Sequence, residues 1–168
     1  TVLPNSLVEV NMGAPILAPQ AIPFINAEQK ANYDIDVNGK SISIGAVSMG
    51  NPHGVLIVDD IASAEVEVIG TALQQNAAFP NGVNVGFMQV LDRSNIKLRV
   101  LERGVGETLA CGTGACAAVV SGILQDKLDS TVVVELPGGK LTVSWFGGEQ
   151  PVTMTGPAVT VYEGQYKL

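Results

Sequence analysis

The chain has 168 residues, of which 46% are hydrophobic and 15% are charged, so it can bury a sizeable core and is not a disordered segment. Its formal net charge of −7 argues against a nucleic-acid or anionic-membrane surface, because phosphate groups are bound by clustered lysine and arginine. The sequence has no run of about 18 or more apolar residues and therefore predicts no transmembrane helix.

The first part of the chain predicts extended structure and one hairpin. Residues 7–13 alternate between apolar and polar side chains, which indicates a strand. Residues 14–24 carry three prolines and predict an extended connector. Residues 33–45 form two alternating runs around Asn38 and Gly39, a pair that adopts the positive φ angles of a type I′ turn. We therefore expect a β-hairpin at residues 33–45.

The next part predicts two strands followed by a helix. Residues 46–60 contain two apolar runs separated by Gly-Asn-Pro-His at 50–53, and the second run is rich in β-branched residues. Residues 61–76 space their apolar side chains as an amphipathic helix does, although Gly70 weakens it by about 1 kcal/mol relative to alanine. We expect its buried face to contain Ile61, Val68, Ile69, Ala72 and Leu73.

The rest of the chain predicts more strands and a second helix. Further strands are expected at 83–91, 95–104 and 158–164, with a hairpin at 131–145. Residues 113–128 form a helix that is apolar almost all round, and such a helix is normally enclosed. The order of elements predicts an α+β fold with eight or nine strands and two helices. We expect a mostly antiparallel, curved, barrel-like sheet wrapped round the buried helix that begins after Cys111.

Cys111 lies where a predicted strand gives way to this helix. If the helix begins near Gly112, its free N–H groups and its dipole favour the thiolate, and the same donors can bind a carboxylate or phosphate. Free cysteines are also commonly small buried apolar residues; this interpretation stays open for Cys111, and we adopt it for Cys116. A separation of about 7.5 Å along the helix axis exceeds the reach of a disulfide. We therefore expect two reduced thiols, as in the cytoplasm.

Several polar residues are further candidates for a site. His53 is the only histidine, and the proline before it holds Asn51 extended, so the amide and the ring are both fixed. Asn84 interrupts an apolar strand, and a buried amide needs partners, for which a polar ligand is one source. Glu102 and Arg103 end a predicted strand. The structural alternatives are a buried or surface histidine and a solvated pair of charges.

Several segments taken together resemble the diaminopimelate epimerase family. They are SMGNPHGVLIVDD at 48–60, NVGFMQV at 84–90, LRVLERGVGETLACGTGACAA at 98–118, VELPGGKL at 134–141 and MTGPAV at 154–159. The combination of GNPH with ERG-x-GET-x-ACGTGA is far more specific than a lone glycine-rich loop. The resemblance extends over nearly all of residues 7–168. The nearest alternative is another cofactor-independent racemase or isomerase of the same fold, acting on proline-like or aromatic substrates.

The resemblance implies an isomerase of lysine biosynthesis that interconverts LL- and meso-diaminopimelate without pyridoxal phosphate or metal. It also implies a cytoplasmic homodimer. The family uses two cysteines on opposite faces of the α-carbon, one removing a proton as thiolate and one supplying a proton as thiol. Two groups are needed, because a single base that returns the proton to the same face does not invert the centre. Cys111 matches the second of these cysteines, and His53 and Glu102 match groups that tune cysteine pKa values.

The same resemblance implies which residues bind the substrate. Gly112 and Thr113 match positions at the start of a helix whose backbone amides hold a substrate carboxylate. Substrate contacts are also implied at Asn51, Asn84, Glu102 and Arg103.

The family chain has two similar halves, and its first cysteine lies in a GNGxRC-type motif of the N-terminal half. This sequence has no such motif, and Cys116 cannot replace it because it lies on the same helix as Cys111 and points elsewhere. We interpret residues 13–156 as the complete C-terminal lobe, and residues 1–12 and 157–168 as strands that belong to the missing half or cross to it. The missing half is the expected partner, and this chain alone is expected to be inactive or nearly so.

Two other classes of function stay open. The chain is alternatively a half-domain that binds an amino-acid carboxylate without turning it over. A thiol enzyme is the other class, and an acyl transferase would need His53 as its base. A redox role is disfavoured because the sequence has no C-x-x-C motif.

Overall fold

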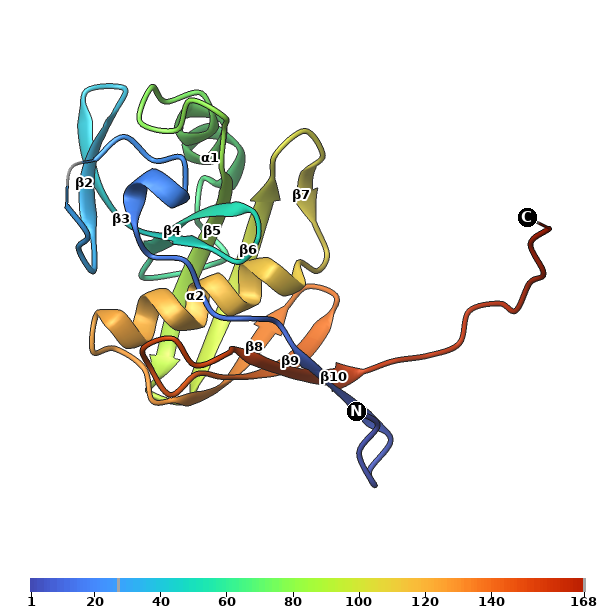
Figure 1. The fold of residues 1–168 in the computed structure, drawn as a ribbon. Helices are drawn as coiled ribbons and strands as arrows, with labels where there is room; N and C mark the ends of the chain where they lie inside the picture. Colours follow the sequence, from blue (N-terminus) through green and yellow to red (C-terminus); the bar gives the residue numbers. More distant parts are fainter. Residues whose placement is uncertain (27, 168) are drawn as a thin grey trace.

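A computed structural model describes residues 1–26 and 28–167 of the chain (Figure 1). Within these residues the fold consists of one ten-stranded sheet, the helices α1 (Val66–Gln74) and α2 (Gly112–Leu124), and the 3-10 turn η1 (Pro19–Ala21). The strands are β1 (Leu7–Asn11), β2 (Tyr33–Val37), β3 (Lys40–Ser48), β4 (Pro52–Ile57), β5 (Asn84–Asp92), β6 (Asn95–Glu102), β7 (Gly106–Thr108), β8 (Thr131–Leu136), β9 (Gly139–Ser144) and β10 (Thr153–Pro157). The α+β class is confirmed.

The sheet is mostly antiparallel, as predicted. Its strand order is β1-β10-β9-β8-β6-β5-β4-β3-β2, and β7 pairs with β6 beside this path. Only the pairs β4–β5 and β6–β8 are parallel among the described strands. The barrel-like expectation is wrong in one respect: β1 and β2 are the end strands of an open sheet. The first and last strands of the path do not pair, so the curvature bends the sheet round α2 without closing it.

Helix α2 lies in the middle of the molecule, with strands on both sides of it (Figure 1). It contacts β3, β4, β5, β6 and β9, and its residues from Gly114 to Gly122 are buried. Small side chains let the strands approach closely: a Cβ added to Gly45 of β3 would lie 1.9 Å from the Ser121 Oγ. The prediction of an enclosed helix is confirmed.

Helix α1 is shorter than the sequence predicts, because residues 60–63 form a turn of their own. The Asp60 carboxylate accepts hydrogen bonds from the backbone N–H groups of Ala62 and Ser63, and this local bonding competes with a helix. The predicted face is partly wrong, since Val68 is 63% exposed and Ile61 is buried from the loop rather than from the helix. Gly70, expected only to weaken the helix, packs close to Leu101 of β6.

The hairpin of β2 and β3 turns at Asn38 and Gly39, with φ angles of 54° and 79°. Both signs are those of the predicted type I′ turn. The short strand β7 and the strand β10 were not predicted. The strand predicted at 158–164 does not form: β10 ends at Pro157, and the exposed chain beyond it leaves the body of the molecule (Figure 1).

The first and last strands of the chain pair with each other at one edge of the sheet. Strand β1 pairs with β10 over its whole length, so residues 7–11 are part of the same sheet as this lobe. Of the predicted crossing segment 157–168, residue 168 lies outside the described residues. The assignment of both ends to a second lobe stays a prediction.

Candidate active site

The first turn of α2 faces the residues that the sequence singled out. The chain leaves the β6–β7 hairpin and passes through Leu109 and Ala110 to Cys111, the residue that precedes the helix. Cys111 is extended, with φ −139° and ψ 105°, and the described residues provide no side-chain cap for the helix there. The amides of Gly112 and Thr113 lie in the first turn, where N–H groups have no partner inside the helix. Donors and the positive end of the helix dipole are therefore directed at this region.

The Cys111 sulfur lies against this first turn and is nearly covered, with the residue only 5% exposed. Its Sγ is 3.7 Å from the Thr113 Oγ1. A Cβ added to Gly114 would lie 3.1 Å from the same Sγ, so the sulfur uses space that only a glycine leaves free. The small residues after Cys111 thus allow the close approach expected from the sequence.

Burial has the largest influence on the ionisation of Cys111. It raises the pKa of the thiol above its ordinary value, while the Thr113 hydroxyl and the Gly114 N–H lower that pKa and the Glu102 carboxylate raises it. The helix donors act in the predicted direction. The expectation that they make the thiolate the favoured form is wrong, because desolvation outweighs them. Cys111 therefore rests as a thiol at neutral pH.

His53 of β4 is connected to the sulfur through Thr113. Its Nε2 lies 3.1 Å from the Thr113 Oγ1 and 3.1 Å from the Asn51 Oδ1, so the threonine hydroxyl is shared between the ring and Cys111. With the proton on Nε2, the ring donates to the Asn51 Oδ1 and leaves Nδ1 as an acceptor. That Nδ1 is the one buried side-chain N or O atom without a partner in the described part of the chain.

The His53 ring is neutral at neutral pH. The residue is 1% exposed, and burial lowers the pKa of its imidazole from 6.5 to about 4. Any effect of His53 on Cys111 therefore passes through hydrogen bonds and not through a positive charge.

Asn84 of β5 lies opposite His53, on the neighbouring parallel strand β4. Its Nδ2 donates to the Pro52 carbonyl at 3.3 Å, and its Oδ1 accepts from the Arg103 backbone N–H at 2.8 Å. The buried amide has partners, as predicted, and the backbone supplies two of them. Asn84 thereby ties the GNPH bend to the end of β6. One N–H and one lone pair of the amide are left for a ligand.

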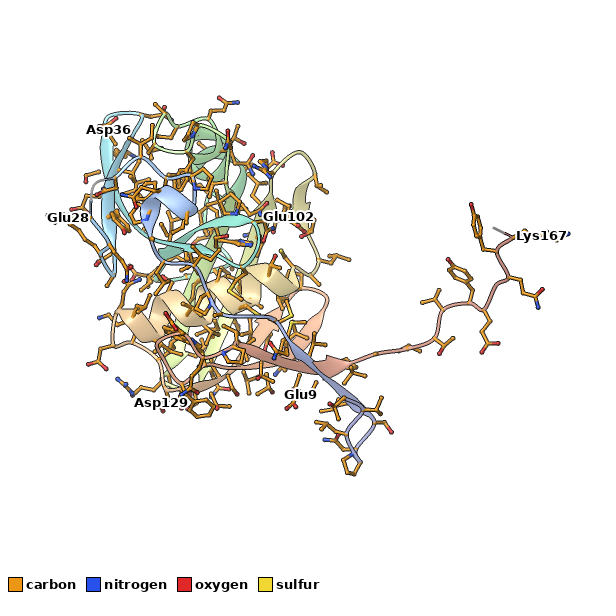
Figure 2. All side chains as sticks on the ribbon, viewed as in Figure 1. Glu9, Glu28, Asp36, Glu102, Asp129 and Lys167 are labelled. Atoms are coloured by element: carbon orange, nitrogen blue, oxygen red, sulfur yellow. The ribbon has the colours of Figure 1, made fainter. Side chains whose placement is uncertain are left out.

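Glu102 and Arg103, the charged pair at the end of β6, make contacts in two different places. The Glu102 carboxylate lies close enough to Cys111 to disfavour its thiolate, and Figure 2 shows Glu102 near the start of α2. The Arg103 guanidinium instead donates to the Asn81 carbonyl in the loop before β5. The structure therefore brings Glu102 to the sulfur but holds the Arg103 side chain on that loop.

Sequence reasoning missed Thr108, whose hydroxyl donates to the Glu102 Oε1 at 2.7 Å. Thr108 ends β7, and this strand is only three residues long. A strand of that length shows no alternation that a sequence pattern can reveal. The available signal was its place in the GET segment of the quoted motif.

Cys116 has the structural role that the sequence indicates. It is fully buried within α2, and burial raises the pKa of its thiol to about 12. Both cysteines are free, so the prediction of two unbonded thiols is confirmed.

Other features that bear on ligands lie apart from these residues. A hollow of about 830 Å³ lies between the β2–β3 turn and α1, where Asp36, Asn38 and Thr71 are among its lining residues. Across residues 1–26 and 28–167, no group of three or more His, Cys, Asp or Glu side chains is arranged to hold a metal ion.

The helices described in residues 1–26 and 28–167 are all too short or too polar to cross a membrane.

Known proteins provide a test of the resemblance. The sequence profile described as diaminopimelate epimerase matches residues 45–161, which is more than half of the chain. This chain belongs to the diaminopimelate epimerase family. The diaminopimelate epimerase of Teredinibacter turnerae is 56% identical over 167 residues, covering 99% of this chain and 60% of that protein. That of Ectopseudomonas mendocina is 59% identical over 160 residues, covering 95% and 58%. The chain thus spans about 60% of the length of these curated diaminopimelate epimerases.

Solved structures bear out the family's fold. A probable proline racemase from Agrobacterium radiobacter K84 superposes with a TM-score of 0.62 at 16% identity, covering 96% of this chain and 54% of that one. At this identity the likeness shows the fold alone. This chain therefore has the same fold as that probable proline racemase.

Proposed function

We propose that the protein containing this chain is a diaminopimelate epimerase that interconverts LL- and meso-diaminopimelate, and that Cys111 is one of its two acid/base groups. The observation that carries the proposal is the position of the Cys111 sulfur. It lies at the uncapped start of α2, beside Glu102, and shares Thr113 with the neutral His53. Together with 56% identity to a diaminopimelate epimerase, this arrangement favours proton transfer at a substrate carbon.

Cys111 serves as proton donor in one direction and as base in the other. The opposing cysteine, as thiolate, removes the α-proton from one face of the carbon, and the electron pair stays on that carbon. The Cys111 S–H then gives its proton to the opposite face, which inverts the centre and leaves the Cys111 sulfur as a thiolate. The raised pKa of Cys111 fits this role, because the proton that it delivers is already on the sulfur.

The start of α2 supplies the carboxylate site. The first-turn amides of Gly112 and Thr113 and the helix dipole favour an anion beside the sulfur. Fixed donors next to the reacting carbon also stabilise the negative charge that develops there. The free N–H and lone pair of Asn84, and the Asn51 amide at the same bend, suit the remaining polar groups of the substrate.

His53, Glu102 and Arg103 have supporting roles in this proposal. His53 holds the Thr113 hydroxyl at the sulfur, and Glu102 sets the charge beside it. Arg103 contributes its backbone N–H to the position of Asn84, and its side chain reaches the substrate only after leaving the Asn81 carbonyl.

The second acid/base cysteine is proposed to come from a further lobe of the same protein. Cys116 cannot supply it, because it is enclosed within α2. Residues 13–156 then form the lobe described above, while the segments 1–12 and 157–168 belong to the other lobe or cross to it. We further propose a homodimer in the cytoplasm that needs neither pyridoxal phosphate nor a metal ion.

Proton exchange in heavy water tests the role of Cys111 in the full-length protein. Cys111→Ala removes one proton-transfer group and is expected to lower the rate of inversion of diaminopimelate by about 10²–10⁴-fold. Cys116→Ala is the matched control, since it changes a cysteine of the same helix that does not reach the site. Undiminished inversion by Cys111→Ala contradicts the proposal. The 168-residue chain by itself is expected to catalyse little or no inversion, and a robust rate from it would show that no second cysteine is needed.

A panel of substrates separates this proposal from the nearest alternatives. Inversion of diaminopimelate without inversion of proline or hydroxyproline supports the proposal, and the reverse pattern identifies another racemase of this fold. Binding of amino acids without exchange identifies a carboxylate-binding module. An acyl transferase is disfavoured by the geometry, because His53 Nε2 is bonded to Thr113 and Asn51 and is not directed at the sulfur.

A further inference from the structure

The Glu102 carboxylate is held by a residue that belongs to a separate strand. The Thr108 hydroxyl donates to the Glu102 Oε1 at 2.7 Å, a short distance typical of a hydrogen bond to a charged acceptor. Thr108 lies on β7, which reverses the chain immediately after β6. The orientation of the glutamate therefore depends on where this hairpin holds its second strand.

The Arg99–Glu107 ion pair stabilises the β6–β7 hairpin on the face opposite to Glu102 and Thr108. The Arg99 Nε and Nη2 donate to the two carboxylate oxygens of Glu107 at 2.6 and 2.8 Å, and the Arg99 Nη1 donates to the Ile61 carbonyl at 3.0 Å. Side chains alternate between the faces of a strand, so Glu107 and its neighbour Thr108 point in opposite directions. The pair thus fixes β7 from the face toward Ile61, and Thr108 reaches Glu102 on the face toward α2.

We propose that Thr108 is a positioning residue, which holds the Glu102 carboxylate against Cys111 and so controls how readily that sulfur gains and loses its proton. The Arg99–Glu107 pair keeps Thr108 in place. The effect of this positioning on catalysis rests on the proposed function. Its effect on the ionisation of the Cys111 thiol does not depend on that function.

The charged and titratable groups around Cys111 determine whether a change at Thr108 makes the thiol ionise more or less readily. Glu102 approaches from β6, Cys116 lies further along α2 as a thiol, and His53 acts from β4 through Thr113 as a neutral ring. Glu102 is therefore the anion that disfavours the Cys111 thiolate. If the carboxylate is free to turn away, like-charge repulsion falls and the thiol ionises at lower pH.

The test is the rate of alkylation of Cys111 by iodoacetamide against pH in the full-length protein, followed by mass spectrometry of the peptide that contains Cys111. Thr108→Val keeps the shape of the side chain but removes the hydroxyl. It is expected to move the midpoint of the profile down by about 0.5–1 pH unit. At pH 7 the alkylation rate rises about two- to threefold, since about three- to tenfold more thiolate is offset by the lower nucleophilicity of a weaker base. Thr108→Ser restores the hydroxyl and is expected to match the wild-type profile.

The background Glu102→Gln separates positioning from a general structural effect. Glu102→Gln alone is expected to lower the midpoint at least as far as Thr108→Val, because it removes the charge itself. Adding Thr108→Val to it is expected to cause no further shift. An unchanged profile in Thr108→Val, or an equal shift in the Glu102→Gln background, overturns the proposal. Neither readout uses epimerase turnover, so the alkylation result stands or fails independently of the proposed function.

Discussion

The two helices cover opposite faces of the same central strands, but they do so in different ways. On β4, Val55 packs in the core around α2, while the next residue, Leu56, packs in the core around α1. Helix α2 is buried on all sides through its middle turns. Helix α1 buries only Val66, Gly70 and Leu73 and leaves Val68 in solvent. One helix is enclosed by the sheet, and the other is laid on it.

This difference suits the position of the candidate site at the start of α2. An enclosed helix is held from every direction, so its first residue, and with it the Cys111 sulfur, has one position relative to β4 and β6. A helix laid on a surface is fixed along a single stripe, and its ends depend on local turns such as that at Asp60. The following predictions test this contrast, from the largest expected effect to the smallest.

A charge introduced into each helix gives the largest contrast. Ala117→Glu places a carboxylate in the fully buried part of α2, where no partner can satisfy it, and is expected to cost about 4 kcal/mol or more, enough to prevent folding. Val68→Glu at the exposed face of α1 is expected to change the free energy of unfolding by less than about 0.5 kcal/mol. Urea unfolding followed by circular dichroism measures both. Similar effects at the two positions would contradict the contrast.

A methyl group added at each helix contact gives the next contrast. Gly45→Ala drives a Cβ to 1.9 Å from the Ser121 Oγ and 3.0 Å from its Cβ, and is expected to destabilise the protein by about 3 kcal/mol. Gly70→Ala meets the end of the Leu101 side chain at 2.7 Å, and the better helix propensity of alanine offsets about 1 kcal/mol of that strain. We expect a loss of about 1 kcal/mol or less for Gly70→Ala, by the same unfolding measurement. Ser121→Ala should partly rescue Gly45→Ala and leave Gly70→Ala unchanged.

The acid sensitivity of the α2 side follows from His53. Its pKa is lowered by burial to about 4, so between pH 6.5 and 4 the unfolded chain binds a proton that the folded chain does not. Stability is therefore expected to fall as the pH drops through this window, by about 3 kcal/mol in total from this residue. His53→Gln should flatten this part of the curve of unfolding free energy against pH. A ring whose NMR shifts titrate near pH 6.5 in the folded protein would contradict the assignment.

The Arg99–Glu107 pair gives the smallest effect, because both side chains are partly exposed. Arg99→Met is expected to cost about 1 kcal/mol, the upper range for an exposed ion pair with two good hydrogen bonds. Arg99 lowers the pKa of the Glu107 carboxyl, so this contribution is present at neutral pH and is lost as the pH falls below the ordinary carboxylate range. Unfolding measured at neutral and acid pH should show wild type and Arg99→Met converging in acid. A constant difference would point to lost packing of the arginine stem.

Much of the fold could be predicted where a local pattern and its burial agree. The Asn38-Gly39 hairpin, the strands β5 and β6 and the enclosed helix α2 all follow from alternation, turn residues or uninterrupted apolar sequence. Each failure has its own cause. Residues 61–65 do not join α1, because the Asp60 carboxylate binds the backbone N–H groups of Ala62 and Ser63. Strand β7 is only three residues long, and β10 depends on pairing with β1, which is distant in the sequence.

The sequence motifs nominated Cys111, His53, Asn84 and Glu102 for the candidate site, and their membership stays a prediction. The structure places Cys111 and His53 on the same Thr113 hydroxyl and pairs His53 with Asn84 across two strands. The contacts between them were not predictable, since Thr113 joins His53 to Cys111 across 60 positions in the sequence. The hydrogen bond from Thr108 to Glu102 was missed because β7, with three residues, shows no pattern in the sequence.

The sequence by itself determined the family, the chemistry of the side chains and the elements whose periodicity is local, because these depend on neighbouring residues. Tertiary structure decided the open form of the sheet and the partners of each polar group. It also reversed the expected ionisation of Cys111. Helix donors near a sulfur can be anticipated from a glycine-rich helix start, but the desolvation that outweighs them depends on the strands that enclose it.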